Sequence, residues 1–278
     1  MAVRVPATSA NLGPGFDALG MAFSLYADVG LDGVEAMPDG AAVAEPTHPA
    51  QVAFERAGGQ GRVWVRNEIP MGRGLGYSGA VRIGGIAVAE AQQNGGTWDK
   101  SSSGALALGT ELEGHADNVA ASLLGGAVAT AGGRAVQVPM NLDAEFVVWV
   151  PPFTTSTNES RRRIGDTLPL ADAVFNIGHT ALLVAAIASG DTSVLREAVR
   201  DRIHQKVRFA LAPACKAALD AGVAAGALCG WLSGSGPTVA FACAPGTGAA
   251  VAAALPDHAD GPVTRKVVTV DLDGARTV

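Results

Sequence analysis

The amino-acid sequence predicts an α+β fold. Short runs of β-branched residues, several with alternating apolar and polar positions, are mixed along the whole chain with longer segments of helical apolar spacing. From Glu145 onward the order is strand, polar loop, helices, strand, turn, strand, helix and strand, which is typical of a sheet with helices on one face. With 278 residues, 48% of them hydrophobic, the chain can bury one large core or two modest ones.

Each element is predicted from its local pattern. Strands are expected where β-branched residues cluster or alternate with polar ones, which gives residues 2–6, 22–31, 61–67, 126–131, 135–139, 145–150, 227–232, 239–243 and 263–270. Helices are expected over longer apolar-rich segments between turn signals, which gives residues 49–57, 78–94, 101–112, 118–124, 170–189, 192–200, 210–221 and 246–254. The chain shows no internal repeat and no low-complexity linker.

Composition excludes several classes of function. A net charge of −6, from 20 basic and 26 acidic residues, argues against nucleic-acid binding, which needs a basic surface. Cys215, Cys229 and Cys243 have no C-x-x-C spacing and lie among small apolar residues, so we expect buried, reduced thiols. The N-terminus lacks a secretion signal, and no stretch approaches ~18 uninterrupted strongly apolar residues. A cytoplasmic protein that binds no membrane is therefore expected.

The most informative segment is the glycine-dense loop PMGRGLGYSGA at residues 70–80. It follows a strand-like stretch and runs directly into an apolar helix-like segment. Glycine lets the backbone approach a ligand closely and adopt positive φ, so several N–H groups can converge on one anion at the positive end of a helix. The loop is therefore predicted to bind phosphate.

Two familiar phosphate loops do not fit it. There is no G-x-x-x-x-G-K-[ST] motif, which excludes a P-loop NTPase. Gly74, Gly76 and Gly79 match G-x-G-x-x-G, but Pro70 closes the preceding stretch, and no strand ending in an acidic residue follows where a Rossmann unit needs one. Taken alone, the loop is equally explained as a glycine-rich turn that packs a helix close to a sheet.

Further blocks change this balance. Two more polar glycine clusters, PATSANLGPGFD at 6–17 and LSGSGPT at 232–238, adjoin strand-like runs. Together with the loop they resemble the homoserine kinase branch of the GHMP small-molecule kinases. The resemblance extends to ELEGHADNVAASLLGG at 111–126, TTSTNESR at 154–161, ADAVFN at 171–176 and DRIHQKVR at 201–208, and so spans most of the chain.

The resemblance implies the two-domain GHMP kinase fold. Its N-terminal domain is an α+β domain like that of ribosomal protein S5, expected over residues 1–142. Its C-terminal domain is ferredoxin-like α+β, expected over residues 143–278. The break would then lie near residues 139–145.

ATP and Mg²⁺ are the ligands that the resemblance implies for the loop. Phosphates would lie on backbone N–H groups from Arg73 to Gly79, with Ser78 Oγ close enough to bind phosphate or metal. Relatives usually carry two serines followed by alanines here, whereas this chain has Tyr77, Ser78 and Gly79. The full set expected at the nucleotide is Pro70, Gly72, Arg73, Gly74, Leu75, Gly76, Tyr77, Ser78 and Gly79.

A metal carboxylate is the second implied part. Glu111 resembles the single metal-binding acid of the family, late on a helix aimed at the phosphates. Glu113 is the competitor, and at two residues further along it must point to a different helix face. A solvated helix-end acid is the alternative for both.

Recognition of the acceptor is the third part. Homoserine is a zwitterion with a primary hydroxyl, so its site needs a cation for the carboxylate and acids or amides for the ammonium. By resemblance Arg161 and Arg208 would bind the carboxylate, Asn11 would orient the hydroxyl and Thr157 would support the phosphoryl group, without a strong side-chain base. The residues expected to contact the amino acid are Asn11, Asp17, His115, Asp117, Arg161, Arg208 and Gly234.

Each of these residues has a simpler alternative. Asn11 and Asp17 flank Gly13, Pro14 and Gly15 and are also typical turn or cap residues. Arg161 is followed by two more arginines, so any of the three could be a surface charge. His204, within DRIHQKVR, is expected at the surface.

The predicted function is ATP-dependent phosphorylation of the hydroxyl of L-homoserine to O-phospho-L-homoserine, in threonine biosynthesis. One alternative is a GHMP kinase acting on another small hydroxylated acid such as threonine, which the residues at Tyr77, His179, Lys206 and Val207 would permit. The other is a catalytically silent relative that binds a nucleotide or metabolite. Small molecules are the expected partners, and a homodimer is left open.

Overall fold

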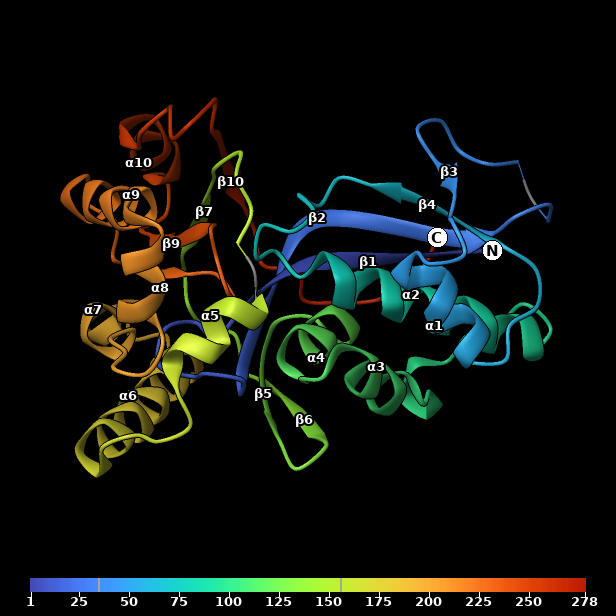
Figure 1. Ribbon diagram of the computed structural model, residues 1–278, viewed down its shortest axis with the longest axis horizontal. Coiled ribbons are helices and arrows are strands. Elements are labelled where there is room, and N and C mark those ends of the chain that lie inside the picture. Colours follow the sequence, from blue (N-terminus) through green and yellow to red (C-terminus); the bar gives the residue numbers. More distant parts are fainter. Residues whose placement is uncertain (35, 156) are drawn as a thin grey trace.

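Two antiparallel sheets organise the chain in the computed structural model (Figure 1), which describes residues 1–34, 36–155 and 157–278. Within these residues the first sheet has the order β11-β1-β2-β4-β3, and β5 pairs with both β2 and β6. Its strands are β1 Ala2–Ala10, β2 Leu19–Leu31, β3 Ala42–Val43, β4 Val63–Asn67, β5 Ala127–Ala131, β6 Arg134–Val138 and β11 Arg276–Thr277. The long β2 pairs with β4 near its end and with β5 near its start.

Four helices cover one face of the first sheet (Figure 1). They are α1 Pro49–Arg56, α2 Tyr77–Gln93, α3 Ala105–Glu113 and α4 Asp117–Leu124. α2 lies in the centre of this layer and is buried along most of its length, from Gly79 to Ala91. Its apolar side packs with Val5 and Val29 of the sheet in the main core. Burial of α2 fixes its first turn in place at the middle of the molecule.

The second sheet has the order β10-β7-β9-β8. Its strands are β7 Glu145–Val150, β8 Cys229–Leu232, β9 Val239–Cys243 and β10 Thr264–Val268. The helices around it are α5 Thr157–Ile164, α6 Leu170–Ser189, α7 Leu195–Ala198, α8 Gln205–Leu211, α9 Pro213–Ala224 and α10 Gly248–Ala254. Together the two sheets and their helices confirm the predicted α+β class.

Apolar side chains point alternately to the two faces of the second sheet, and both faces are buried. Val147 and Trp149 of β7 belong to a core that includes Phe209, Cys215 and Val251. The intervening Phe146 and Val148 belong to the main core, where Phe146 packs on Phe23 of β2 at 5.5 Å between ring centroids. The sequence predicted helices on one face only, whereas α6, α7 and the first sheet cover the other. The two sheets thus share one apolar core.

Most elements lie where the sequence predicts them, and the differences are local. Residues 154–161, expected to be a polar loop, contain the start of α5, and α8 was not predicted. The segments 101–112 and 192–200 each begin with a short 3-10 turn, Lys100–Ser102 and Thr192–Val194, which Asp99 and Asp191 cap. These aspartates bond to the backbone two residues on, which competes with a regular helical start.

The last strand returns to the first sheet. β11 pairs with β1, and the N–H of Val278 donates to the carbonyl of Ala2 at 2.9 Å. Figure 1 shows the two termini side by side. The change of sheet between β6 and β7 supports the domain boundary expected at residues 142 and 143, which stays a prediction. β11 follows this boundary in sequence but belongs to the first sheet.

α6 is unusually apolar for its exposure. Within the described part of the chain it alone is long and apolar enough to cross a membrane by length and composition, with a mean hydropathy of 1.6 in its best window and 22% of that window buried. Leu170, Val174 and Ile177 are exposed on it by 79%, 59% and 69%. Its polar Asn176, by contrast, is buried.

The three cysteines are free and buried, as predicted. Burial raises the pKa of the Cys215 and Cys229 thiols to about 12 and that of Cys243 to about 11. Because the thiolate is the reactive form, none of the three is suited to nucleophilic chemistry at neutral pH.

Candidate active site

The glycine loop is held between the two sheets and opens α2. Gly72, Gly74 and Gly76 have φ values of 67°, 76° and 67°, in the left-handed region. A Cβ at Gly74 would lie 2.3 Å from the carbonyl oxygen of Ser233, and one at Gly76 would lie 1.8 Å from Thr8 Oγ1. Both positions therefore require glycine, so close packing accounts for part of the motif.

The start of α2 has the character of an anion site. Gly76 is its N-cap and offers no side-chain hydrogen bond, and the first turn contains no acidic residue. The N–H groups of a first helical turn have no acceptor within the helix, and they lie at the positive end of its dipole. Close packing against Thr8 already explains why Gly76 has no capping side chain, and the first-turn N–H groups left without a side-chain acceptor suit a phosphate.

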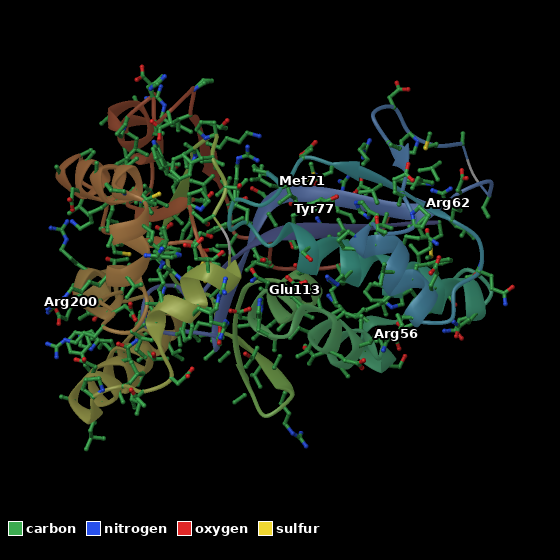
Figure 2. All side chains as sticks on the ribbon, in the orientation of Figure 1. Arg56, Arg62, Met71, Tyr77, Glu113 and Arg200 are labelled. Carbon is green, nitrogen blue, oxygen red and sulfur yellow. The ribbon has the colours of Figure 1, made fainter. Side chains whose placement is uncertain are left out.

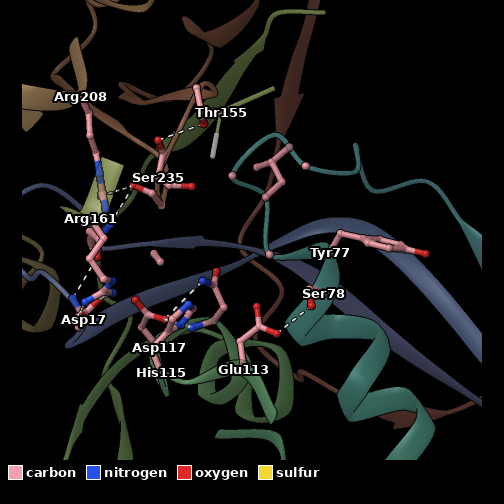
Figure 3. Close-up of a pocket in the computed structure, with 18 residues that line it drawn as sticks. Asp17, Tyr77, Ser78, Glu113, His115, Asp117, Thr155, Arg161, Arg208 and Ser235 are labelled. Atoms are coloured by element: carbon pink, nitrogen blue, oxygen red, sulfur yellow. Dashed lines mark hydrogen bonds and ion pairs between the residues drawn. The ribbon is translucent and has the colours of Figure 1, made fainter. Parts of the chain in front are cut away.

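One cavity lies beside this helix end (Figure 3). Segments far apart in the sequence line it: the turn after β1, the glycine loop, the start of α4, α5, α8 and the turn after β8. The predicted site residues among its lining are Asn11, Asp17, Gly72, Gly74, Leu75, Gly76, Tyr77, Ser78, His115, Asp117, Arg161, Arg208 and Gly234. The structure thus brings most of the predicted nucleotide and acceptor residues to one place.

Four predicted residues do not line the cavity. Pro70 precedes it, and Gly79 lies in the first turn of α2 against Asn118. The Arg73 side chain points to the second sheet and donates to the carbonyls of Pro151 and Pro152 at 3.1 and 2.7 Å. Glu111 is the fourth. The side chain of Thr157 lies outside the described residues, while Thr155 lines the cavity.

The structure does not bring Glu111 to the cavity, where its predicted metal role would place it. Its carboxylate is exposed and pairs with Arg56 of α1 at 2.6 Å, on the far side of α3. Glu113 instead lines the cavity, where its Oε2 accepts from Ser78 Oγ at 2.8 Å and from Arg82 Nε at 2.8 Å. Figure 2 shows Glu113 near the middle of the molecule and Arg56 farther out along the helices. Residues two apart on a helix point to nearly opposite sides, so only one acid can reach Ser78.

The acidic wall of the cavity is built on α4 and the turn after β1. Asp117 is buried, and its Oδ1 accepts from His115 Nδ1 at 2.9 Å and from the N–H of Asn118 at 2.7 Å. The hydrogen bond to Asp117 raises the pKa of His115, against the opposing effect of burial. His115 is therefore protonated to a higher pH than an ordinary histidine.

Asn11 and Asp17 combine structural and cavity positions. Both have positive φ, at 71° and 56°, and Asn11 Oδ1 accepts from the N–H of Asp17 at 3.0 Å, which confirms the turn role. Asn11 Nδ2 also donates to the carbonyl of Gly234 at 3.0 Å, across 223 positions of sequence. The turn therefore presents both side chains to the cavity that they line.

Two guanidinium groups form the basic wall. Arg161 makes two hydrogen bonds to Asp17, both at 2.7 Å, whereas Arg163 pairs with Glu159 at the surface. Arg208 is 4% exposed, and its Nη1 donates to the carbonyl of Gly234 at 2.8 Å. Burial, and next the charge of Arg161, lowers the pKa of Arg208 to about 10, so it remains charged at neutral pH.

Comparisons with known proteins identify the family of this chain. The model of the GHMP kinases N terminal domain matches residues 46–126, and that of the GHMP kinases C terminal matches residues 183–261. A homoserine kinase from Thermus thermophilus is 39% identical, over 95% of this chain and 94% of its own. One from Moorella thermoacetica is also 39% identical, over 91% and 92%. This chain belongs to the homoserine kinase family of GHMP kinases.

Solved structures support the same fold for this family member. A homoserine kinase from Cytophaga hutchinsonii superposes with a TM-score of 0.85 at 25% identity, over 100% of this chain and 97% of the other. A mevalonate kinase superposes with a TM-score of 0.69 at 11% identity, which is a likeness of fold. The chain is therefore a kinase with the two-part GHMP fold.

Tyr77 stands where the family loop usually has serine, and its hydroxyl reaches the start of α1. Its hydroxyl lies 2.8 Å from Nε2 of His48, the N-cap of α1, and Figure 3 shows its ring directed away from Asp117 and His115. His48 Nδ1 accepts from the N–H of Ala50, so Nε2 carries the hydrogen and the hydroxyl accepts it. The hydroxyl end of the ring thus lies beside α1, while Tyr77 still contributes to the cavity lining.

Ala10, Asn118, Thr155 and Ser235 line the cavity but were not among the predicted site residues. Arg82 and His204, also not predicted, contact lining residues from outside the cavity. Arg82 follows Ser78 by four positions on α2 and so shares its helix face, a spacing that could have revealed it. His204, expected at the surface, is fully buried and contacts Arg208, also four positions on. Its burial could not be read from its polar neighbours, because the covering residues, Phe16 among them, come from a distant turn.

Proposed function

We propose that this homoserine kinase family member transfers the γ-phosphoryl group of ATP to the hydroxyl of L-homoserine and so forms O-phospho-L-homoserine, a step in threonine biosynthesis. One observation carries the proposal. An uncapped helix end suited to phosphate adjoins a cavity with both carboxylates and guanidinium groups. The names of the family relatives support the same acceptor.

ATP and Mg²⁺ fit the residues present. The first-turn N–H groups of α2 suit the phosphates, and the hydroxyl of Ser78 with the carboxylate of Glu113 offers the hard oxygen ligands that Mg²⁺ prefers. When bound, the metal would neutralise phosphate charge during transfer. We therefore move the metal assignment from Glu111 to Glu113 and retain Ser78.

The acceptor assignment follows from charge. The carboxylate of a zwitterion can bind Arg208, whose described hydrogen-bond partners are neutral, together with Arg161, and its ammonium can bind Asp17 and Asp117. An uncharged polyol has no anion to offer the buried Arg208. Asn11 Nδ2 uses one hydrogen on Gly234, and a second hydrogen is suited to orienting the acceptor hydroxyl. The proposal assigns no strong side-chain base, since phosphoryl transfer depends mainly on positioning and charge stabilisation.

The test is a coupled ADP-release assay over amino alcohols, hydroxy acids and sugars, with each product identified by mass. We expect L-homoserine to give the highest kcat/KM, ahead of threonine, mevalonate and galactose. Phosphorylation of an uncharged polyol without homoserine would overturn the acceptor assignment. ATP binding with no turnover of any acceptor would instead support a silent relative.

We also propose a cytoplasmic homodimer with small-molecule ligands only. The exposed apolar face of α6, formed by Leu170, Val174 and Ile177, supports self-association, because exposed apolar patches mark interaction surfaces. Their spacing of four and three residues places the three side chains on one side of the helix.

A further inference from the structure

His204 is a buried titratable group to which the proposed chemistry assigns no role. It lies at the N-cap of α8 and is fully buried, with its ring stacked on Phe16 at 5.2 Å between centroids. Its Nε2 lies 2.8 Å from the carbonyl oxygen of Gly13, and its Nδ1 lies 3.0 Å from Nη1 of Arg208.

These two partners determine the form of the ring. A carbonyl oxygen only accepts hydrogen bonds, so Nε2 must carry a hydrogen. A guanidinium only donates, so Nδ1 must present a lone pair. Both contacts are satisfied together only by the neutral Nε2–H tautomer.

The same contacts connect two segments that line the cavity. Gly13 belongs to the turn that carries Asn11 and Asp17, and Arg208 lies one helical turn after His204 on α8. Asp201 fixes the start of α8, because its Oδ2 accepts from the N–H groups of His204 and Gln205 at 2.9 and 2.7 Å. Contacts other than the one with Arg208 therefore fix the position of the histidine ring.

Arg208 depends on few contacts for its orientation. Its Nη1 donates to His204 and to the carbonyl of Gly234, while its buried Nε has no hydrogen-bond partner among the described residues. A buried guanidinium without a full set of acceptors is costly unless a ligand or water supplies the rest. Arg208 lines the cavity, so an anion bound there would supply the charged acceptor that its described contacts lack.

We propose that His204, as the neutral Nε2–H tautomer, is a positioning residue that aims Arg208 at the carboxylate of the amino-acid substrate and ties it to the turn carrying Asn11 and Asp17. The inference rests on the proposed function, because it takes the ligand of Arg208 to be a carboxylate. The charged groups around the ring are Asp201, whose Oδ2 is 3.9 Å from Nε2, together with Arg208 and Asp17.

Two variants separate positioning from packing. In His204→Asn the amide oxygen can replace Nδ1 as the acceptor for Arg208 but cannot reach Gly13. In His204→Gln the amide nitrogen can replace Nε2 as the donor to Gly13 but leaves Arg208 without its acceptor. We expect His204→Gln to raise KM for the amino acid about tenfold or more, with KM for ATP nearly unchanged. His204→Asn should raise it less.

A double-mutant cycle with Arg208→Ala supplies the control. If His204 acts through Arg208, the effect of His204→Gln on KM for the amino acid should largely disappear in the Arg208→Ala background. Equal KM effects on both substrates, or full additivity, would overturn the positioning role. An inactive wild type over the whole acceptor panel would instead show that the proposed function had failed.

A readout without turnover completes the test. Nitrogen-15 spectra of histidine-labelled protein, with His204 assigned by its loss in His204→Gln, should show a protonated Nε2 and an unprotonated Nδ1 at neutral pH. The opposite tautomer, or a doubly protonated ring, would contradict the inference whatever the activity.

Discussion

Apart from Arg208, the charged side chains that line the cavity are paired with groups of opposite charge. The pairs are Glu113 with Arg82, Asp17 with Arg161, and Asp117 with His115. Pairing offsets part of the cost of removing these groups from water. A zwitterionic ligand must therefore replace one side chain of a pair as the partner of the other. Substitution of one side chain of a pair will then change how tightly its partner binds the ligand.

Ser78 gives the first prediction at this scale. Its Oγ donates to Glu113 beside the start of α2. We expect Ser78→Ala to slow turnover by about 10–1000-fold, or ~1.4–4 kcal/mol of transition-state stabilisation, because a contact to phosphate or metal is lost. Steady-state kinetics measure this effect. A rate constant equal to that of the wild type would remove Ser78 from the proposed machinery.

The two glutamates of α3 form a matched pair. Glu113→Gln should raise the Mg²⁺ concentration needed for half-maximal activity and lower turnover, because the carboxylate beside Ser78 is lost. Glu111→Gln, which removes only an exposed ion pair with Arg56, should change neither by more than about twofold. Mg²⁺ titrations of both variants measure the difference, and the opposite ranking would return the metal assignment to Glu111.

His204 makes stability depend on pH. Burial lowers its pKa in the folded chain to about 4, from an ordinary value of 6.5. The unfolded chain binds this proton more readily, so the stabilisation is complete above pH 6.5 and is lost as the pH falls toward 4. Denaturant unfolding over this range should show a steeper loss in the wild type than in His204→Gln. Parallel curves for the two proteins would be the contrary result.

At the scale of elements, the sequence predicts the positions of helices and strands well. It predicts poorly which side chains of a helix point toward the site. α6 and β9 begin and end at the predicted residues, because each is a long or uninterrupted apolar pattern. α8 was missed because it is short and its start depends on Asp201. The sequence could not decide between Glu111 and Glu113 for a similar reason, since which face of α3 lies toward Ser78 depends on how α2 packs.

Most of the predicted residues that the structure brings to the cavity lie in loops and turns, whereas Ser78, Asp117 and Arg208 lie on helices. Loop glycines, and polar residues in turns such as Asn11 and Asp17, have conformations that their local sequence largely dictates. The contacts of Arg82 with Glu113 and of His204 with Gly13 were missed because these partners come from elements distant in sequence. Local sequence motifs therefore predicted the loop and turn residues of the site. They did not predict the contacts with distant elements that hold these residues in place.

The apolar face of α6 gives a prediction of its own. If Leu170, Val174 and Ile177 form the homodimer contact, Ile177→Lys should shift the chain from dimer to monomer, because a charge would be buried in the interface. Light scattering after size-exclusion chromatography measures the mass. Leu211→Lys, at an exposed apolar residue of α8, is the control and should leave the mass unchanged. A wild type that is monomeric throughout would refute the proposed dimer.

At the scale of the whole molecule, the glycine loop joins the two sheets. Arg73 extends from this loop and donates to the carbonyls of Met71, Pro151 and Pro152. The carbonyl of Gly74 accepts from Ser233 Oγ at 2.6 Å, on the turn after β8. The position of the loop is thus set jointly by both parts of the chain.

Arg73 tests that joint control. Arg73→Met keeps the apolar stem but removes donors to three carbonyls, so we expect a loss of about 1–3 kcal/mol in the free energy of unfolding. KM for ATP should rise more than KM for the amino acid, because the loop is predicted to hold the nucleotide. Thermal unfolding and two-substrate kinetics measure these effects. A normal stability with normal KM for ATP would show that the loop holds its shape alone.

The return of β11 to β1 also has a consequence for how the molecule is connected. The residues of the second sheet are inserted within the first unit, since the chain leaves after β6 and comes back through the bridge between Val270 and Phe23 to β11. An insertion has two covalent tethers where an appended segment has one. Rotation of one half about the other would have to twist both crossings and separate Phe146 from Phe23 in the shared core, so the path of the chain and the core together oppose opening of the cavity.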